Sequence, residues 1–199
     1  MKKIIFGLAL AAMTFSACNG NTAKSADTTQ STADTPTAAS PQSAADTTVK
    51  PSGTGFPSKQ IIAAYLQLKN ALTQDNGKDA ATAAGALVTT LSKADMKSLP
   101  QAQMKAYMDI ADDLKENAEH ISENAGKIDH QREHFIPLSE DMADFIKAFG
   151  NGGQTLYRDF CPMADNGKGA IWISEQQAIK NPYLGKAMPT CGTVKETIR

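Results

Sequence analysis

Apolar residues recur every three or four positions along residues 58–149, which is the spacing of amphipathic α-helices. This pattern predicts four helices: one from Ser58 to the turn at 75–77, a second over 80–91, a third from Pro100 to 121 and a fourth over 128–149. Pro137 lies inside the fourth helix and is expected to kink or split it. Four amphipathic helices with short connections predict an antiparallel up-down bundle.

The third and fourth helices are expected to turn methionines toward the core. Met104, Met108 and Met142 fall on the apolar rows of these two helices, and methionine fills irregular core space well. The acidic residues of the third helix flank its apolar row. We therefore interpret them as a solvated face and not as an acid–base pair.

The segment 154–199 has a different pattern. Residues 155–160 and 170–174 read as two short strands around the turn-forming residues 165–169, and a helical turn is expected from Ser174. An isolated hairpin is marginally stable, so it must dock on the bundle, with Trp172 and Tyr157 as anchors. The predicted fold is all-α: an up-down four-helix bundle with a small C-terminal β-hairpin or irregular tail docked on it.

The N-terminal residues read as a targeting segment. Two lysines precede an apolar run over residues 4–15, and Ser16 and Ala17 precede Cys18. The run is too short to span a bilayer and resembles a bacterial lipoprotein signal, although an ordinary secretory signal is the alternative. We predict a signal peptide at 1–17, a lipidated Cys18 that begins a disordered tether at 18–57, and one folded domain at 58–199.

These features place the chain in the bacterial envelope, lipid-anchored at the periplasmic face, with the outer membrane favoured over the inner. Loss of Lys2 and Lys3 with the signal would change the formal charge from −1 to −3. This balance does not suggest a nucleic-acid partner. The tether is rich in Thr, Ala, Ser and Pro, and we expect it to act as a passive spacer.

Two thiols and two thioethers frame the C-terminal segment. Cys161 and Met163 open it, and Met188 and Cys191 close it. Thiolate and thioether are soft ligands that suit Cu(I), so these four residues are a candidate copper site. After lipidation of Cys18, however, two cysteines remain, and a structural Cys161–Cys191 disulfide is the alternative.

The histidines give a weaker signal. His130 and His134 are four residues apart and share a helix face. His134 is expected at the edge of the bundle interior and is a candidate metal ligand, whereas we expect His130 and His120 on the solvated surface. A Cys161–His134 nucleophile has no local support, and the common catalytic motifs are missing from the sequence. We therefore predict that the protein is not an enzyme.

Several stretches of the sequence resemble a known family; they are 129–135, 138–139, 156–157, 161–164, 169–174, 181–185 and 188–192. Through them the chain resembles a domain of unknown function found in lipoproteins of Gram-negative bacteria. The same domain is appended to periplasmic adaptor subunits of heavy-metal efflux pumps. Residues 65–72 resemble the start of this domain, so the resemblance covers about 58–199. Because this domain occurs together with copper and silver efflux adaptors, the resemblance implies a metal-handling role. The ligands it implies are Cys161, Met163, Met188 and Cys191, with His134.

The leading hypothesis is a lipid-anchored periplasmic module that binds or handles a soft metal, with copper as Cu(I) the favoured ion. It would pass metal to an efflux-pump adaptor or to a metalloprotein. The alternative hypothesis is a disulfide-stapled, non-catalytic interaction module of an envelope complex.

Overall fold

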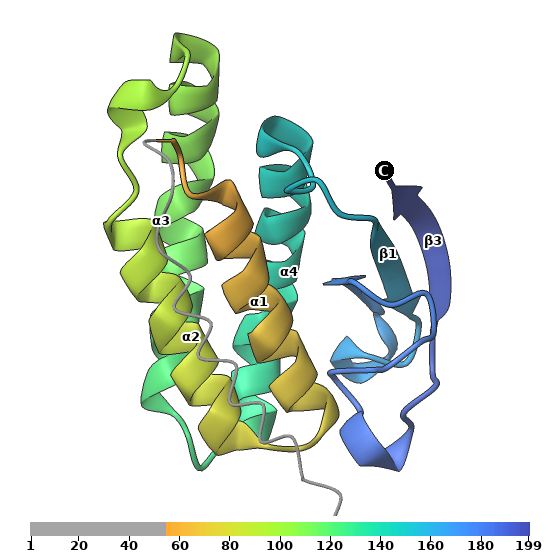
Figure 1. Cartoon of the computed structure of the whole chain (residues 1–199). Helices are drawn as coiled ribbons and strands as arrows, with labels where there is room; N and C mark the ends of the chain where they lie inside the picture. Colours follow the sequence, from red (N-terminus) through yellow and green to blue (C-terminus); the bar gives the residue numbers. More distant parts are fainter. Residues whose placement is uncertain (1–54) are drawn as a thin grey trace, which may run out of the picture. The chain divides into compact units, whose positions relative to one another are not determined.

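The computed structural model describes residues 55–199, and its first part is a set of four helices (Figure 1). They are α1 (Ser58–Thr73), α2 (Gly77–Ser92), α3 (Gln101–Glu123) and α4 (Ile128–Phe149). Each helix packs against the next one in the sequence, which confirms the four predicted helices. α4 passes through Pro137 as one helix, so the expected split does not occur.

The core row of α3 differs from the predicted one. Met108 is 61% exposed, and the neighbouring Tyr107 is buried instead. The Tyr107 hydroxyl donates a hydrogen bond to the carbonyl of Leu91, at 3.0 Å. Leu114, Ala118 and Ile121 are buried as expected, whereas Met104 is only half-buried. In α4, Met142 is fully buried as predicted.

An aromatic cluster closes one end of the helices. Phe56 stacks on Phe149 with ring centroids 4.8 Å apart and meets the edge of Tyr107 at 5.0 Å. Phe145 stacks on Phe149 at 4.6 Å. Phe56, which falls within the segment 18–57 predicted as a tether, is thus partly buried against the core.

The C-terminal segment forms a three-stranded antiparallel sheet, so the fold is mixed and not all-α. The strands are β1 (Leu156–Cys161), β2 (Ala170–Ser174) and β3 (Thr193–Ile198), in the order β2-β1-β3. The first two are the predicted hairpin. β3 was not predicted, since its residues are almost all exposed and carry no apolar stripe. The helical turn expected at Ser174 is also wrong, because the chain is irregular there.

The sheet meets the helices along strand β2, and β3 lies farthest from them (Figure 1). The Tyr65 hydroxyl of α1 accepts a hydrogen bond from the amide of Ile173 at 3.0 Å and also bonds to Ser139 of α4 at 2.9 Å. The Tyr183 hydroxyl donates to the carbonyl of Ile171. The two tyrosines thus bond to two backbone groups of β2 on the edge that β1 does not occupy. Trp172 is fully buried, as predicted.

No helix within residues 55–199 is both long and apolar enough to cross a membrane. The predictions for the signal peptide, for Cys18 and for the tether up to residue 54 fall outside the described residues.

Candidate metal centre

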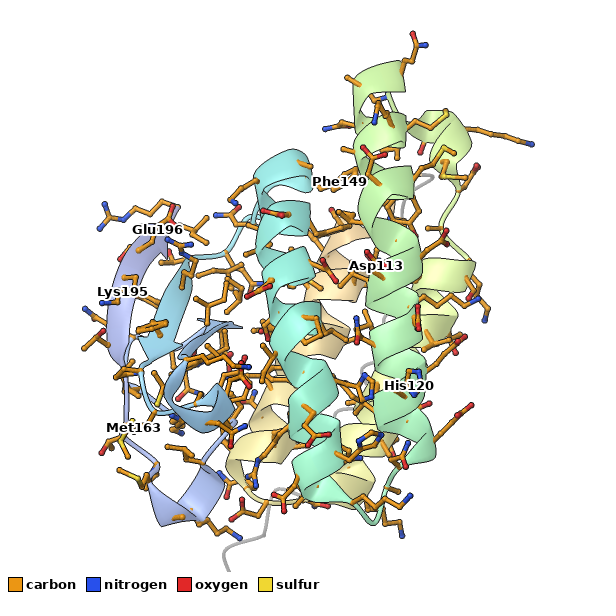
Figure 2. All side chains as sticks on the ribbon, turned by 180° about the vertical axis from the view of Figure 1, so that it is seen from behind. Asp113, His120, Phe149, Met163, Lys195 and Glu196 are labelled. Carbon is orange, nitrogen blue, oxygen red and sulfur yellow. The ribbon has the colours of Figure 1, made fainter. Side chains whose placement is uncertain are left out.

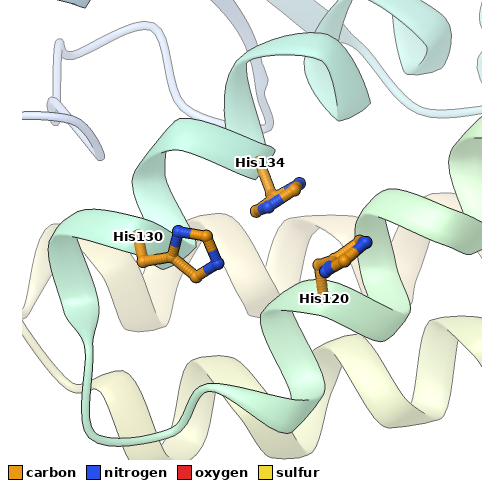
Figure 3. Close-up of side chains that lie close together, drawn as sticks. All are labelled: His120, His130 and His134. Atoms are coloured by element: carbon orange, nitrogen blue, oxygen red, sulfur yellow. The ribbon is translucent and has the colours of Figure 1, made fainter.

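All three histidines of the chain come together between α3 and α4 (Figure 3). His120 comes from α3, and His130 and His134 come from α4. One ring nitrogen of each can be chosen so that the three atoms lie within 4.8 Å of one another. Sequence reasoning named only His134 as a ligand, so the structure adds two residues that were expected to be solvated surface.

His134 is the central member of the cluster. Its ring stacks on that of His120, with centroids 4.3 Å apart and planes inclined by 6°. It meets the ring of His130 edge to face, at 4.7 Å. His120 and His130 keep 45% and 40% of their side chains exposed. The cluster is therefore open to an ion from solvent.

Hydrogen bonds orient two of the rings for metal binding. Nδ1 of His130 lies 3.0 Å from the carboxylate of Glu133, and Nδ1 of His134 lies 3.1 Å from Oδ1 of Asn117. Both partners are oxygen acceptors, so each Nδ1 carries the proton and each Nε2 keeps its lone pair. A metal-binding histidine almost always has such a partner on its other nitrogen.

The environment of His134 favours the neutral, ligating form. Burial lowers the pKa of His134, and the neighbouring charges of His120 and His130 lower it further. Glu116 and Glu133 act in the opposite direction. A neutral imidazole at physiological pH can bind a cation without first losing a proton.

Three imidazoles suit zinc, copper, nickel or iron. At a Zn–N distance of 2.0–2.1 Å, ligands of a tetrahedral ion lie about 3.3 Å apart. The nitrogens, within 4.8 Å of one another, would have to close by about 1.5 Å, which ring rotation can supply. Three protein ligands would leave a fourth position for water or another group.

The structure also brings the two predicted thiols together. Sγ of Cys161 and Sγ of Cys191 are 2.7 Å apart. Thiolates that share a tetrahedral zinc ion, with Zn–S bonds of about 2.3 Å, lie about 3.8 Å apart. The thiols would thus have to separate to admit an ion, whereas a disulfide needs them closer. Met163 and Met188 are 52% and 40% exposed.

The sulfur residues and the histidines lie at separate places in the fold. Figure 2 shows Met163 beside the sheet and His120 on α3, with α4 between them. His134 turns toward α3, where it contacts Asn117 and His120. The set proposed from sequence therefore divides in two: His134 joins the histidines, and the cysteines form their own pair.

One sequence signal could have found the histidine cluster. α3 ends at Glu123 and α4 begins at Ile128, so the connection is very short. Short connections make successive helices antiparallel neighbours. His120 lies within one turn of the end of α3, and His134 lies within two turns of the start of α4, so the two can meet across the interface.

The fold and the site define a class: a helical domain with a C-terminal antiparallel sheet and a group of histidines able to hold a metal. More specifically, residues 61–154 match the model of the family described as "Protein of unknown function (DUF3347)". This match includes all three histidines and ends before β1. Comparison with curated proteins and with solved structures gave no match.

Proposed function

We propose that this protein is a non-catalytic metal-binding module whose metal is held by His120, His130 and His134. The observation that carries the proposal is that the only three histidines of the chain converge on one place from two helices. The oriented Nδ1 atoms of His130 and His134 support it. Histidines that served only as solvated surface residues would not be expected to gather at one place.

An imidazole site favours a different form of copper from the one predicted from the sulfur residues. Imidazole suits Cu²⁺ and Zn²⁺, and divalent affinity rises to a maximum at Cu²⁺. We therefore propose a divalent ion, with copper binding more tightly than zinc. Lipid anchoring at Cys18, the periplasmic location and transfer to an efflux adaptor or metalloprotein remain part of the proposal. They rest on the signal-like N-terminus and on the resemblance.

The proposal is tested by titrating the protein with Zn²⁺ in a calorimeter. Zinc is the suitable probe because it has no redox chemistry and cannot oxidise the thiols. Replacing any one histidine by alanine should reduce the affinity at least about 100-fold, and Glu133→Gln should reduce it about 10–100-fold through loss of ring orientation. Lys115→Ala, a change at a partly exposed position of α3, is the matched control. Unchanged affinity in all three histidine variants would refute the site.

A second candidate is Cu(I) binding by Cys161 and Cys191, with Met163 and Met188 as further ligands. The specific observation in its favour is that the fold brings the two thiols to one place, although they would have to separate from 2.7 Å to admit the ion. Cu(I) would take only the reduced pair. Titration with Cu(I) under anaerobic conditions separates the candidates, because Cys191→Ser should abolish binding at the sulfur site and leave Zn²⁺ binding at the histidines intact.

A further inference from the structure

We infer that Cys161 and Cys191 form a thiol–disulfide exchange pair, in which Cys191 accepts an incoming disulfide and Cys161 resolves it. This goes beyond the metal site, and the two proposals stand or fall separately. The partner it implies is a disulfide of low molecular weight or one carried by an oxidoreductase. The inference rests on how the two sulfurs are positioned and on their unequal access to solvent.

The two cysteines come from different elements. Cys161 ends β1, and Cys191 lies just before β3, which pairs with β1 on the opposite side from β2. Their Sγ atoms are in contact at 2.7 Å. The strand pairing brings the elements together, so the sulfurs meet without any bond between them.

Contacts that do not involve sulfur fix the position of Cys191. The buried Asn181 side chain donates to the carbonyl of Cys191 at 2.7 Å, and its backbone amide donates to the carbonyl of Pro189 at 2.9 Å. Gly192 follows with φ +142°, and a Cβ there would approach the Trp172 ring to 2.8 Å. These contacts position Cys191 beside Cys161 without involving either sulfur, so the bond could form and break without refolding of the segment.

The two sulfurs differ in access. Cys161 is fully buried, whereas Cys191 is partly exposed. An incoming disulfide can reach Cys191 but not Cys161, and access decides which sulfur reacts in thiol–disulfide exchange. The hydrogen bond with Cys161, followed by burial, raises the pKa of Cys191 above its ordinary value.

The exchange balances in two steps. The Cys191 thiolate, having lost its proton to solvent, attacks one sulfur of the incoming disulfide. A mixed disulfide forms, and the other sulfur of the incoming disulfide leaves as a thiolate. Cys161 then loses its proton and attacks Sγ of Cys191, which displaces the second thiolate. Two electrons pass from the cysteine pair to the incoming disulfide, which is reduced to two thiols, and the Cys161–Cys191 bond remains.

Incubation of the reduced full chain with oxidised glutathione, followed by alkylation and peptide mapping by mass spectrometry, tests the inference. Mapping separates this pair from Cys18. The wild-type protein should show Cys161 and Cys191 peptides joined with the loss of two hydrogens. Cys161→Ser should retain glutathione on Cys191, while Cys191→Ser should carry at least about tenfold less on Cys161, because burial protects it.

Two outcomes would overturn the inference. One is a wild-type protein whose two thiols remain fully alkylatable after the incubation. The other is equal glutathione labelling in the two variants, which would show that access does not distinguish the sulfurs. Circular dichroism of each variant checks folding, and Cys161→Ala replaces Cys161→Ser if the serine hydroxyl is not tolerated in the buried position. Zn²⁺ affinity should be the same before and after oxidation.

Discussion

The buried carboxylate of Asp159 should make the stability of the protein fall as the pH rises toward neutrality. Asp159 is fully buried on β1, directly across from Trp172 of β2. Within residues 55–199, neither of its carboxylate oxygens has a hydrogen-bond partner. Burial raises the pKa of Asp159 from 3.8 to about 7, although the positive charge of Lys69 opposes this shift.

The sign follows from proton linkage. A carboxyl group with a raised pKa binds more protons in the folded than in the unfolded protein between pH 3.8 and about 7. Its contribution to the free energy of unfolding is therefore full at acidic pH and is lost as the pH rises through about 7. With these two pKa values, the loss between pH 5 and pH 7 is about 2 kcal/mol.

Urea denaturation of the wild type and of Asp159→Asn, from pH 5 to pH 8, tests this reasoning. Asparagine resembles the protonated acid, so the variant should lack this loss and gain about 2 kcal/mol on the wild type between pH 5 and pH 7. Asp141→Asn is the matched control, because burial and neighbouring acids raise the pKa of Asp141 only to about 6. Its effect should be nearly complete by pH 6. Parallel pH profiles for wild type and Asp159→Asn would refute the reasoning.

Three further changes test other parts of the structure. Tyr65→Phe removes the acceptor of the Ile173 amide and should lower the free energy of unfolding by about 1–3 kcal/mol, measured by urea denaturation; no change would mean that water replaces the hydroxyl. Arg132→Ala removes donors to the carbonyls of Leu72 and Pro182 and should lower the free energy of unfolding by about 2–4 kcal/mol. An unchanged urea midpoint would mean that Arg132 does not stabilise the contact between these two segments. Zn²⁺ at 100 times its dissociation constant should add about 2.7 kcal/mol of stability. Chelation should reverse this gain. A melting temperature that changes neither with Zn²⁺ nor with the chelator would contradict binding to the folded state.

The helices could be predicted from sequence because their apolar rows repeat over several turns. Which residues of α3 face the core was harder to predict near the start of the helix. Tyr107 and Met108 are neighbours, and the hydrogen bond from the Tyr107 hydroxyl to Leu91 favours burial of Tyr107. β3 could not be predicted by the same means. Its residues are exposed, so its position depends on backbone pairing with β1, which leaves no apolar pattern.

The candidate sites, too, could be predicted only in part from the sequence. Spacing within one helix related His130 to His134, but His120 belongs to the preceding helix and only the packing of α3 on α4 brings it close. The pairing of Cys161 with Cys191 was one of two open alternatives. Contact between their sulfurs favours the pair, since a shared ion would require greater separation.

The positions of the two sites imply that they act independently. The histidines lie on the face of α4 that packs against α3, inside the segment 61–154 matched to the family. The cysteines lie in the sheet that follows this segment. Because the two groups share no partner, a cysteine substitution and a histidine substitution should have additive effects on stability, within about 0.5 kcal/mol. A larger coupling would mean that α4 transmits strain between the sheet and the metal site, since it is the helix that contacts both.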